Sequence, residues 1–308
     1  MSRTLGRGRH RSIETLRFCR PPRTTETDWA TCLRAQERGA RPDESPIDEF
    51  YGKHEGLTAL GGLIESALRD DLALVLADQL LLGYVSATEL YFRRMLAATA
   101  RICPRVRSLV RDVEIAFGAL DFYPRDEIEY SLTEKITLTE AGKVRSLLET
   151  RFGVRVDQQS DLERAIDQFE SLSNLRHALV HSGGVVNSRN AKNLGNVTSG
   201  STWRVHLGPA ELQVAASVCM DLVRTSHDEI GKQVFWNWIT TGHLKGNWSH
   251  DRARIGRFAS VFFSVRDAVD DPPGPRSQKD LHDLAKSILG DVSSSQLRAP
   301  GERRAVRP

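Results

Sequence analysis

The sequence predicts a mainly helical protein, because three kinds of helix signal recur along its 308 residues. From residue 74 to residue 95, apolar side chains recur at spacings of three and four, which places them on one face of a long helix. Residues 137–140 and 160–163 each carry the Ser/Thr-x-x-Glu pattern of a capping box, which marks a helix start. Pro104 and Pro209 are suited to the first turn of a helix. We therefore expect an antiparallel helical bundle.

Start and stop signals predict the main helices in order along the chain, over about 70–100, 104–118, 137–153, 160–182 and 209–231. A glycine closes each of the last four, because glycine readily adopts the left-handed backbone that ends a helix. Residues 121–134 are expected to form a loop with short elements. Residues 185–207 are predicted to be a surface excursion with a short strand over 203–207, and Gly61-Gly62 to be a turn.

Composition divides the chain into four regions. Residues 1–46 form a basic arm or linker that we expect to be disordered, and residues 47–231 form the bundle. Residues 232–270 form a small aromatic-rich helical annex, and residues 271–308 form a linker, a short helix near 281–289 and a disordered tail. The arm has seven arginines against Glu14 alone in its first 23 residues. Such an arm either holds RNA phosphates by charge or is only a solvated tail.

Hydrophobic residues at 40% and charged residues at 27% are typical of a soluble globular protein. The longest apolar run, residues 72–85, is interrupted by Asp78 and is shorter than the roughly 20 residues of a membrane span. No apolar stretch follows the N-terminal arginines, as a signal peptide would require. The four cysteines are widely spaced and contain no Cys-x-x-Cys pair. We expect a cytoplasmic protein with reduced thiols, no membrane association, and no metal or cofactor.

One segment, residues 175–184, combines residue types and spacing that suit catalysis. Arg176, His177 and His181 stand at the end of the predicted 160–182 helix, and two glycines follow. With 43 Lys and Arg and 9 His in the chain, chance alone predicts about one Arg-x-x-x-x-His match, so the spacing by itself indicates nothing. The capped helix before the motif and the glycines after it are what make it informative.

The residue types suit cleavage of RNA without a metal. This reaction needs a group that moves a proton at the ribose 2′-hydroxyl or at the leaving oxygen, and a fixed cation for the charged phosphorane. His181 can move the proton, and Arg176 can clamp the phosphate because its guanidinium keeps its charge. Five helical positions leave Arg176 and His181 about 140° apart around the axis, so one ideal helix does not bring them together.

The motif resembles the signature of the HEPN superfamily, in particular its RiboL-PSP-HEPN or MAE-like ribonuclease members. These carry Arg, a polar residue, three variable residues and His late in a helical bundle, positions that Arg176, His177 and His181 match in turn. The resemblance covers about residues 70–231, and residues 86–91 are similar to the family's first core helix. The chain departs from the pattern by carrying His177 where Asn or Asp is more usual, and by its long extensions.

The resemblance implies a homodimer in which facing motifs line one composite cleft. It implies a metal-independent endoribonuclease that leaves 2′,3′-cyclic phosphate ends, with RNA as substrate and a role in prokaryotic antiviral defence or as the toxin of a toxin-antitoxin pair. An antitoxin or a nucleotidyltransferase would be the partner. The alternative function is a non-catalytic HEPN module that binds RNA, nucleotide or a protein through the same groove. A purely structural helical adaptor is a third interpretation.

Each candidate residue also has a purely structural interpretation. Arg176 can pair with Glu170 or another carboxylate while the two histidines only cap carbonyls at the helix end. Glu89 is either half of an exposed pair with Arg93 or a supporting residue that braces Arg176. His243, His250 and the tryptophans near them suggest a metal site or a base-stacking platform, but core packing explains them better.

Overall fold

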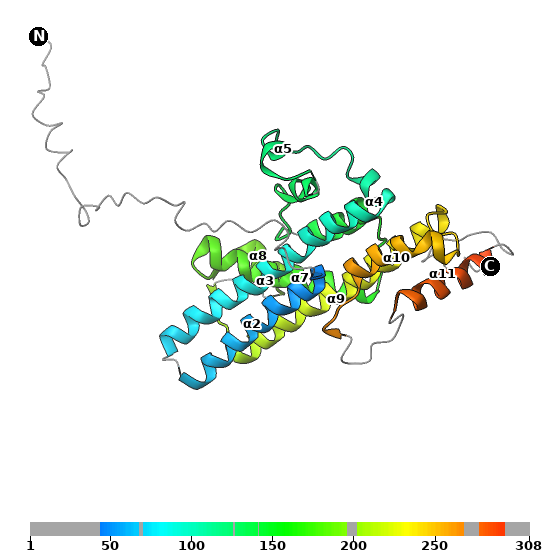
Figure 1. Cartoon of the computed structure of the whole chain (residues 1–308). Helices are drawn as coiled ribbons and strands as arrows, with labels where there is room; N and C mark the ends of the chain where they lie inside the picture. The colour runs from blue at the N-terminus through cyan, green and yellow to red at the C-terminus, as the bar shows by residue number, and fades with distance from the viewer. Residues whose placement is uncertain are drawn as a thin grey trace, which may run out of the picture. The chain divides into compact units, whose positions relative to one another are not determined.

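The computed structural model describes residues 44–67, 70–125, 127–140, 142–195, 202–267 and 277–292. The described part is mainly helical, as predicted (Figure 1). The basic arm, apart from its last residues, lies outside the described residues, as do the linker at 268–276 and the tail from Ser293.

Three long helices lie against one another and carry most of the core: α2 (Pro46–Ala67), α3 (Asp70–Ile102) and α9 (Pro209–Thr240). Helix α7 (Asp161–Ser182) packs on α9 and α3. The buried apolar residues form one continuous cluster, in which Phe92 and Met95 of α3 are fully buried. The predicted apolar stripe of α3 is therefore the centre of the bundle from Ala77 onward, whereas Leu74 at its start is 42% exposed.

Helix α3 is also long and apolar enough, from Leu72 to Ile102, to cross a membrane by length and composition alone. The core helix of a folded bundle satisfies the same test. In this chain α2, α7, α9 and α10 all contact α3.

Helix α2 was not predicted, and the turn predicted at Gly61-Gly62 is wrong because both glycines lie inside this helix. Glycines recur along α2 and weaken its helical signal in the sequence. Long-range contacts hold it instead. Asp48, fully buried in its first turn, accepts hydrogen bonds from the Ser264 hydroxyl (2.5 Å) and the Val265 amide (3.1 Å). Gly83 of α3 lets Leu57 pack closely, since a Cβ there would lie 2.7 Å from its side chain.

Between α3 and α7 the chain forms short elements: α4 (Pro104–Leu109), α5 (Ala119–Phe122), the 3-10 helix η2 (Ile128–Thr133), α6 (Lys143–Leu147) and the π-helix η3 (Leu148–Phe152). The helix predicted to run from Pro104 to Gly118 is too long, because it ends at Leu109 and Phe117 is 81% exposed. The short elements expected over 121–134 are present.

The helix start predicted at Thr137 is also wrong. The Leu138 amide donates to Glu89 of α3 (2.9 Å), and the Gly142 amide donates to Glu170 of α7 (2.6 Å). These bonds hold residues 138–140 and Gly142 in a non-helical path, and α6 begins only after Gly142, which is in the left-handed conformation (φ 75°). The predicted stop at Gly153 is confirmed.

After α7 the chain forms a hairpin in which β1 (Val185–Val186) pairs antiparallel with β2 (Trp203–Arg204), and the short helix α8 (Ser188–Asn193) lies between them. The strand at 203–204 was predicted, whereas α8 was not. In this segment, β1 and α8 pack against α7.

Helix α9 continues nine residues past Gly231, so the stop predicted there is wrong. Gly231 instead allows a close approach of Phe262, whose ring would lie 3.1 Å from a Cβ at that position. Phe262 belongs to α10 (Trp248–Phe262), which packs on α2 and α3, and α11 (Gln278–Val292) packs on α10 and α9. The short helix expected near 281–289 is confirmed.

Candidate active site

Helix α7 presents the motif at its C-terminal end, as the sequence predicted. The Ser160 hydroxyl accepts from the Glu163 amide (3.1 Å) and caps the helix start. The helix ends at Gly183, whose left-handed backbone (φ 57°) allows the Gly184 amide to bond the Ala178 carbonyl. The first cap fixes where the helix begins, and the second fixes where it ends and therefore where its last turn points its side chains.

His177 and His181 are both exposed and lie one helical turn apart. Their ring centroids are 4.6 Å apart and the rings are tilted by 47°. Within the described part of the chain, neither ring makes a hydrogen bond or an ion pair, and they are not used to cap the helix carbonyls. The pair is available to an incoming molecule.

Arg176 directly precedes His177 in α7 and is half-buried. Among the described residues its guanidinium has no carboxylate partner, and Glu170, one partner that the structural interpretation offered, accepts from the Gly142 amide. A guanidinium without a counterion keeps its donors available for an anion such as a phosphate.

One copy of the chain does not bring Arg176 and His181 together. Helix α7 continues without a break through both residues, so they keep the separation of about 140° around the axis. Val180 lies between them on the helix surface and is 45% exposed. The unpaired arginine and the histidine pair therefore flank an exposed apolar residue at the end of α7.

Glu89 does not brace Arg176 in this structure. Its carboxylate accepts from the Leu138 amide (2.9 Å) and lies 4.0 Å from the Arg93 guanidinium. The other interpretation, the pair with Arg93, is the one that forms, and Glu89 additionally fixes the segment before α6. The supporting role predicted for Glu89 is thus not seen: the contacts that its carboxylate makes, both through Oε1, are with Leu138 and Arg93.

Arg204 of β2 is a residue of this region that the motif did not indicate. Its Nη1 donates to the Gly183 carbonyl (3.1 Å), which directly follows the last turn of α7. Burial raises the pKa of Asp78 on α3, and the positive charges of Arg204 and His206 partly oppose this. A cation next to the end of α7 adds to the positive character around the histidines. The sequence placed Arg204 in a strand, but no spacing linked it to Gly183.

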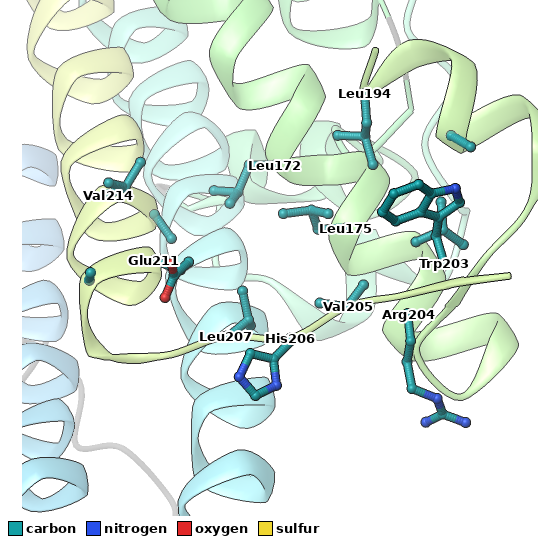
Figure 2. Close-up of a pocket in the computed structure, with 14 residues that line it drawn as sticks. Leu172, Leu175, Leu194, Trp203, Arg204, Val205, His206, Leu207, Glu211 and Val214 are labelled. Carbon is teal, nitrogen blue, oxygen red and sulfur yellow. The ribbon is translucent and has the colours of Figure 1, made fainter. Parts of the chain in front are cut away.

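A pocket of about 410 Å³ lies beside the hairpin, and Arg204 and His206 are among the residues that line it (Figure 2). Its walls are largely apolar and come from α7, α8, α9 and β2, with Leu172, Leu175, Leu194, Trp203 and Val205 among them. Leu175 directly precedes Arg176, so α7 contributes to both the pocket and the motif. A volume above roughly 300 Å³ is in the range of small-molecule sites.

Three histidines outside the motif have structural contacts. His250 bonds the buried carboxylate of Asp251 (2.6 Å), and the His243 ring packs edge-on against Trp238. His227 is buried in the core. In the described part of the chain, no group of three or more His, Cys, Asp or Glu side chains could hold a metal ion.

Comparisons with protein-family models, with curated proteins and with solved structures find no match to this chain.

Proposed function

We propose that this protein is an endoribonuclease that cuts RNA by transesterification, with Arg176, His177 and His181 in its active site. The observation that carries the proposal is the end of α7, where two exposed imidazoles have ring centroids 4.6 Å apart. The first of them directly follows Arg176, which has no counterion among the described residues. The resemblance of this motif to that of HEPN ribonucleases, together with the helical bundle around it, supports the same function.

The two imidazoles and Arg176 are sufficient for every proton transfer and for charge stabilisation in this reaction. One imidazole takes the proton of the ribose 2′-hydroxyl while the 2′-oxygen forms a bond to phosphorus. The bond between phosphorus and the 5′-oxygen breaks, and a protonated imidazole gives its proton to that oxygen. Arg176 stabilises the added negative charge on the phosphorane. The products are a 2′,3′-cyclic phosphate and a 5′-hydroxyl.

A homodimer is part of the proposal because one helix separates Arg176 from His181. Two copies that meet at the ends of their α7 helices would place the arginine of one beside the histidines of the other. Val180, exposed between the two residues, gives this contact an apolar centre. The HEPN-like arrangement of such a dimer, a cytoplasmic role in antiviral defence or as a toxin, and an antitoxin or nucleotidyltransferase partner remain predictions from the resemblance.

Purified full-length protein and end-labelled RNA in a chelating buffer test the function. We expect cleavage with cyclic-phosphate ends, and a loss of at least about 100-fold in rate in His181→Ala and in Arg176→Ala. Matched controls lie on the same helix: exposed Gln168→Ala for the histidine and exposed Arg164→Ala for the arginine should cut at the wild-type rate. Wild-type protein that binds RNA without yielding products would contradict the enzyme and support the non-catalytic RNA-binding module.

A further inference from the structure

Strand β2 separates two chemically different surfaces. In the extended segment 203–206, the side chains of Trp203 and Val205 lie on the same side as Leu172 and Leu175 of α7 (Figure 2). The side chains of Arg204 and His206, which also line the pocket, extend to the opposite side. This alternation follows from the two-residue period of an extended chain. One face of a short extended segment is therefore aromatic and apolar, and the other is cationic.

The pocket leaves a large aromatic surface in contact with solvent. The Trp203 side chain is 39% exposed although it forms part of an apolar wall. A flat apolar group placed beside the indole would cover it and would also contact the leucines of α7. Stacking on an aromatic side chain is how proteins hold unpaired nucleobases without reading their sequence.

The cationic face of β2 lies beside the proposed catalytic residues. Arg204 bonds the carbonyl of Gly183, which is two residues beyond His181. A nucleotide has the matching pair of properties, a flat base and a charged phosphate, whereas a lipid chain or an apolar peptide would use only the pocket. Charge and shape together therefore favour a nucleotide as the occupant.

We propose that the pocket beside Trp203 binds one unpaired base of the RNA substrate, with Arg204 holding the adjacent phosphate near the end of α7. This assignment rests on the proposed ribonuclease function, since it makes the pocket a substrate subsite of that reaction. It predicts that the enzyme acts on single-stranded RNA, because a base inside a duplex cannot enter the pocket.

Binding can be measured apart from cleavage. The probe is a fluorescent ten-nucleotide RNA of mixed sequence with 2′-O-methyl riboses, which lacks the attacking hydroxyl, and the readout is anisotropy with full-length protein. Trp203→Ala should weaken binding about tenfold, and Trp203→Phe should keep most of the affinity. Trp248→Ala is the matched control, because Trp248 is 38% exposed and lies on α10. It should bind like the wild type.

A series of the same RNA with one base removed at a time locates the contact. In the wild type, one abasic position should cost about tenfold in affinity, and in Trp203→Ala this penalty should disappear. Wild-type affinity in Trp203→Ala, or equal losses in the two tryptophan variants, would overturn the subsite. If His181→Ala abolishes cleavage while Trp203→Ala binds normally, only the subsite fails. If no RNA is cut but the base-dependent loss is seen, only the nuclease fails.

Discussion

The same side chain serves two different purposes in this molecule, as His227 in the core and the pair His177 and His181 at the end of α7 show. The Nε2 of His227 lies 3.0 Å from the Phe262 carbonyl, an oxygen that only accepts, so this nitrogen carries the hydrogen. Its Nδ1 then accepts from the Tyr91 hydroxyl at 3.1 Å. The two exposed histidines make no such bonds within the described residues. A histidine with both nitrogens satisfied holds the fold, and one with neither satisfied is available for chemistry.

The largest expected difference between the buried and the exposed histidines is in how much each contributes to stability. His227→Ala should lower the free energy of unfolding by about 3 kcal/mol, because it leaves a cavity and removes the partners of Tyr91 and Phe262. His181→Ala should change it by less than about 0.5 kcal/mol, as expected at an exposed site. Urea denaturation of the two variants measures both values. Equal destabilisation would remove the distinction, since His181 would then also be a structural residue.

The pH dependence of stability tests the same contrast in the unmodified chain. Burial lowers the pKa of His227 below its usual 6.5, although its bond to Phe262 and the carboxylates of Asp228, Asp267 and Asp48 oppose this. The unfolded state therefore binds the proton first as the pH falls below about 6.5. Stability is complete above that pH and declines below it, by at most about 1.4 kcal/mol per pH unit for one proton.

Urea midpoints between pH 5 and pH 7 measure this slope. His227→Gln keeps a donor for Phe262 but does not titrate, so its slope should be smaller. The slope that remains belongs mainly to His243, whose pKa burial lowers as well, with help from the nearby Arg254 and Arg257 charges. A flat profile in the wild type would mean that His227 is not held neutral.

Local patterns predicted the parts of the fold that local interactions determine. The stripe of α3, the Ser160 cap and the glycine stop of α7 all depend on residues a few positions apart, and all three predictions are confirmed. The same signals located His177 and His181 at a helix end. Helix α2 escaped prediction because a distant contact, between Asp48 and Ser264, holds it.

The contacts of the candidate site that the sequence did not predict also join residues far apart along the chain. Local spacing predicted the pair of Glu89 with Arg93, but it could not predict that Glu89 also accepts from the amide of Leu138, which is 49 positions away. Arg204 reaches Gly183 across the hairpin, a contact that no spacing encodes. Glycine was ambiguous for a related reason: Gly183 ends a helix, while Gly231 lies inside one to make room for Phe262.

The smallest expected effect concerns the helix end that positions His177 and His181. At Gly183 the backbone is left-handed (φ 57°) and a Cβ would meet no atom within 4 Å, so Gly183→Ala adds backbone strain without a clash. We expect a loss of about 1 kcal/mol in unfolding free energy. Gly118→Ala is the matched control, because its Cβ would also meet nothing and its φ is −61°. That variant should be neutral or slightly stabilising.

Strain introduced by Gly183→Ala should change the position of His181, because Gly183 fixes where the last turn of α7 ends. Relief of the strain would fray that turn, which carries His181. Gly183→Ala should therefore lower RNA cleavage more than its small loss of stability explains, while Gly118→Ala leaves cleavage unchanged. Thermal unfolding and single-turnover rates on the same preparations compare the two effects. Wild-type rates in Gly183→Ala would show that the position of His181 does not depend on this cap, and that the exposed pair needs no fixed helix end to act.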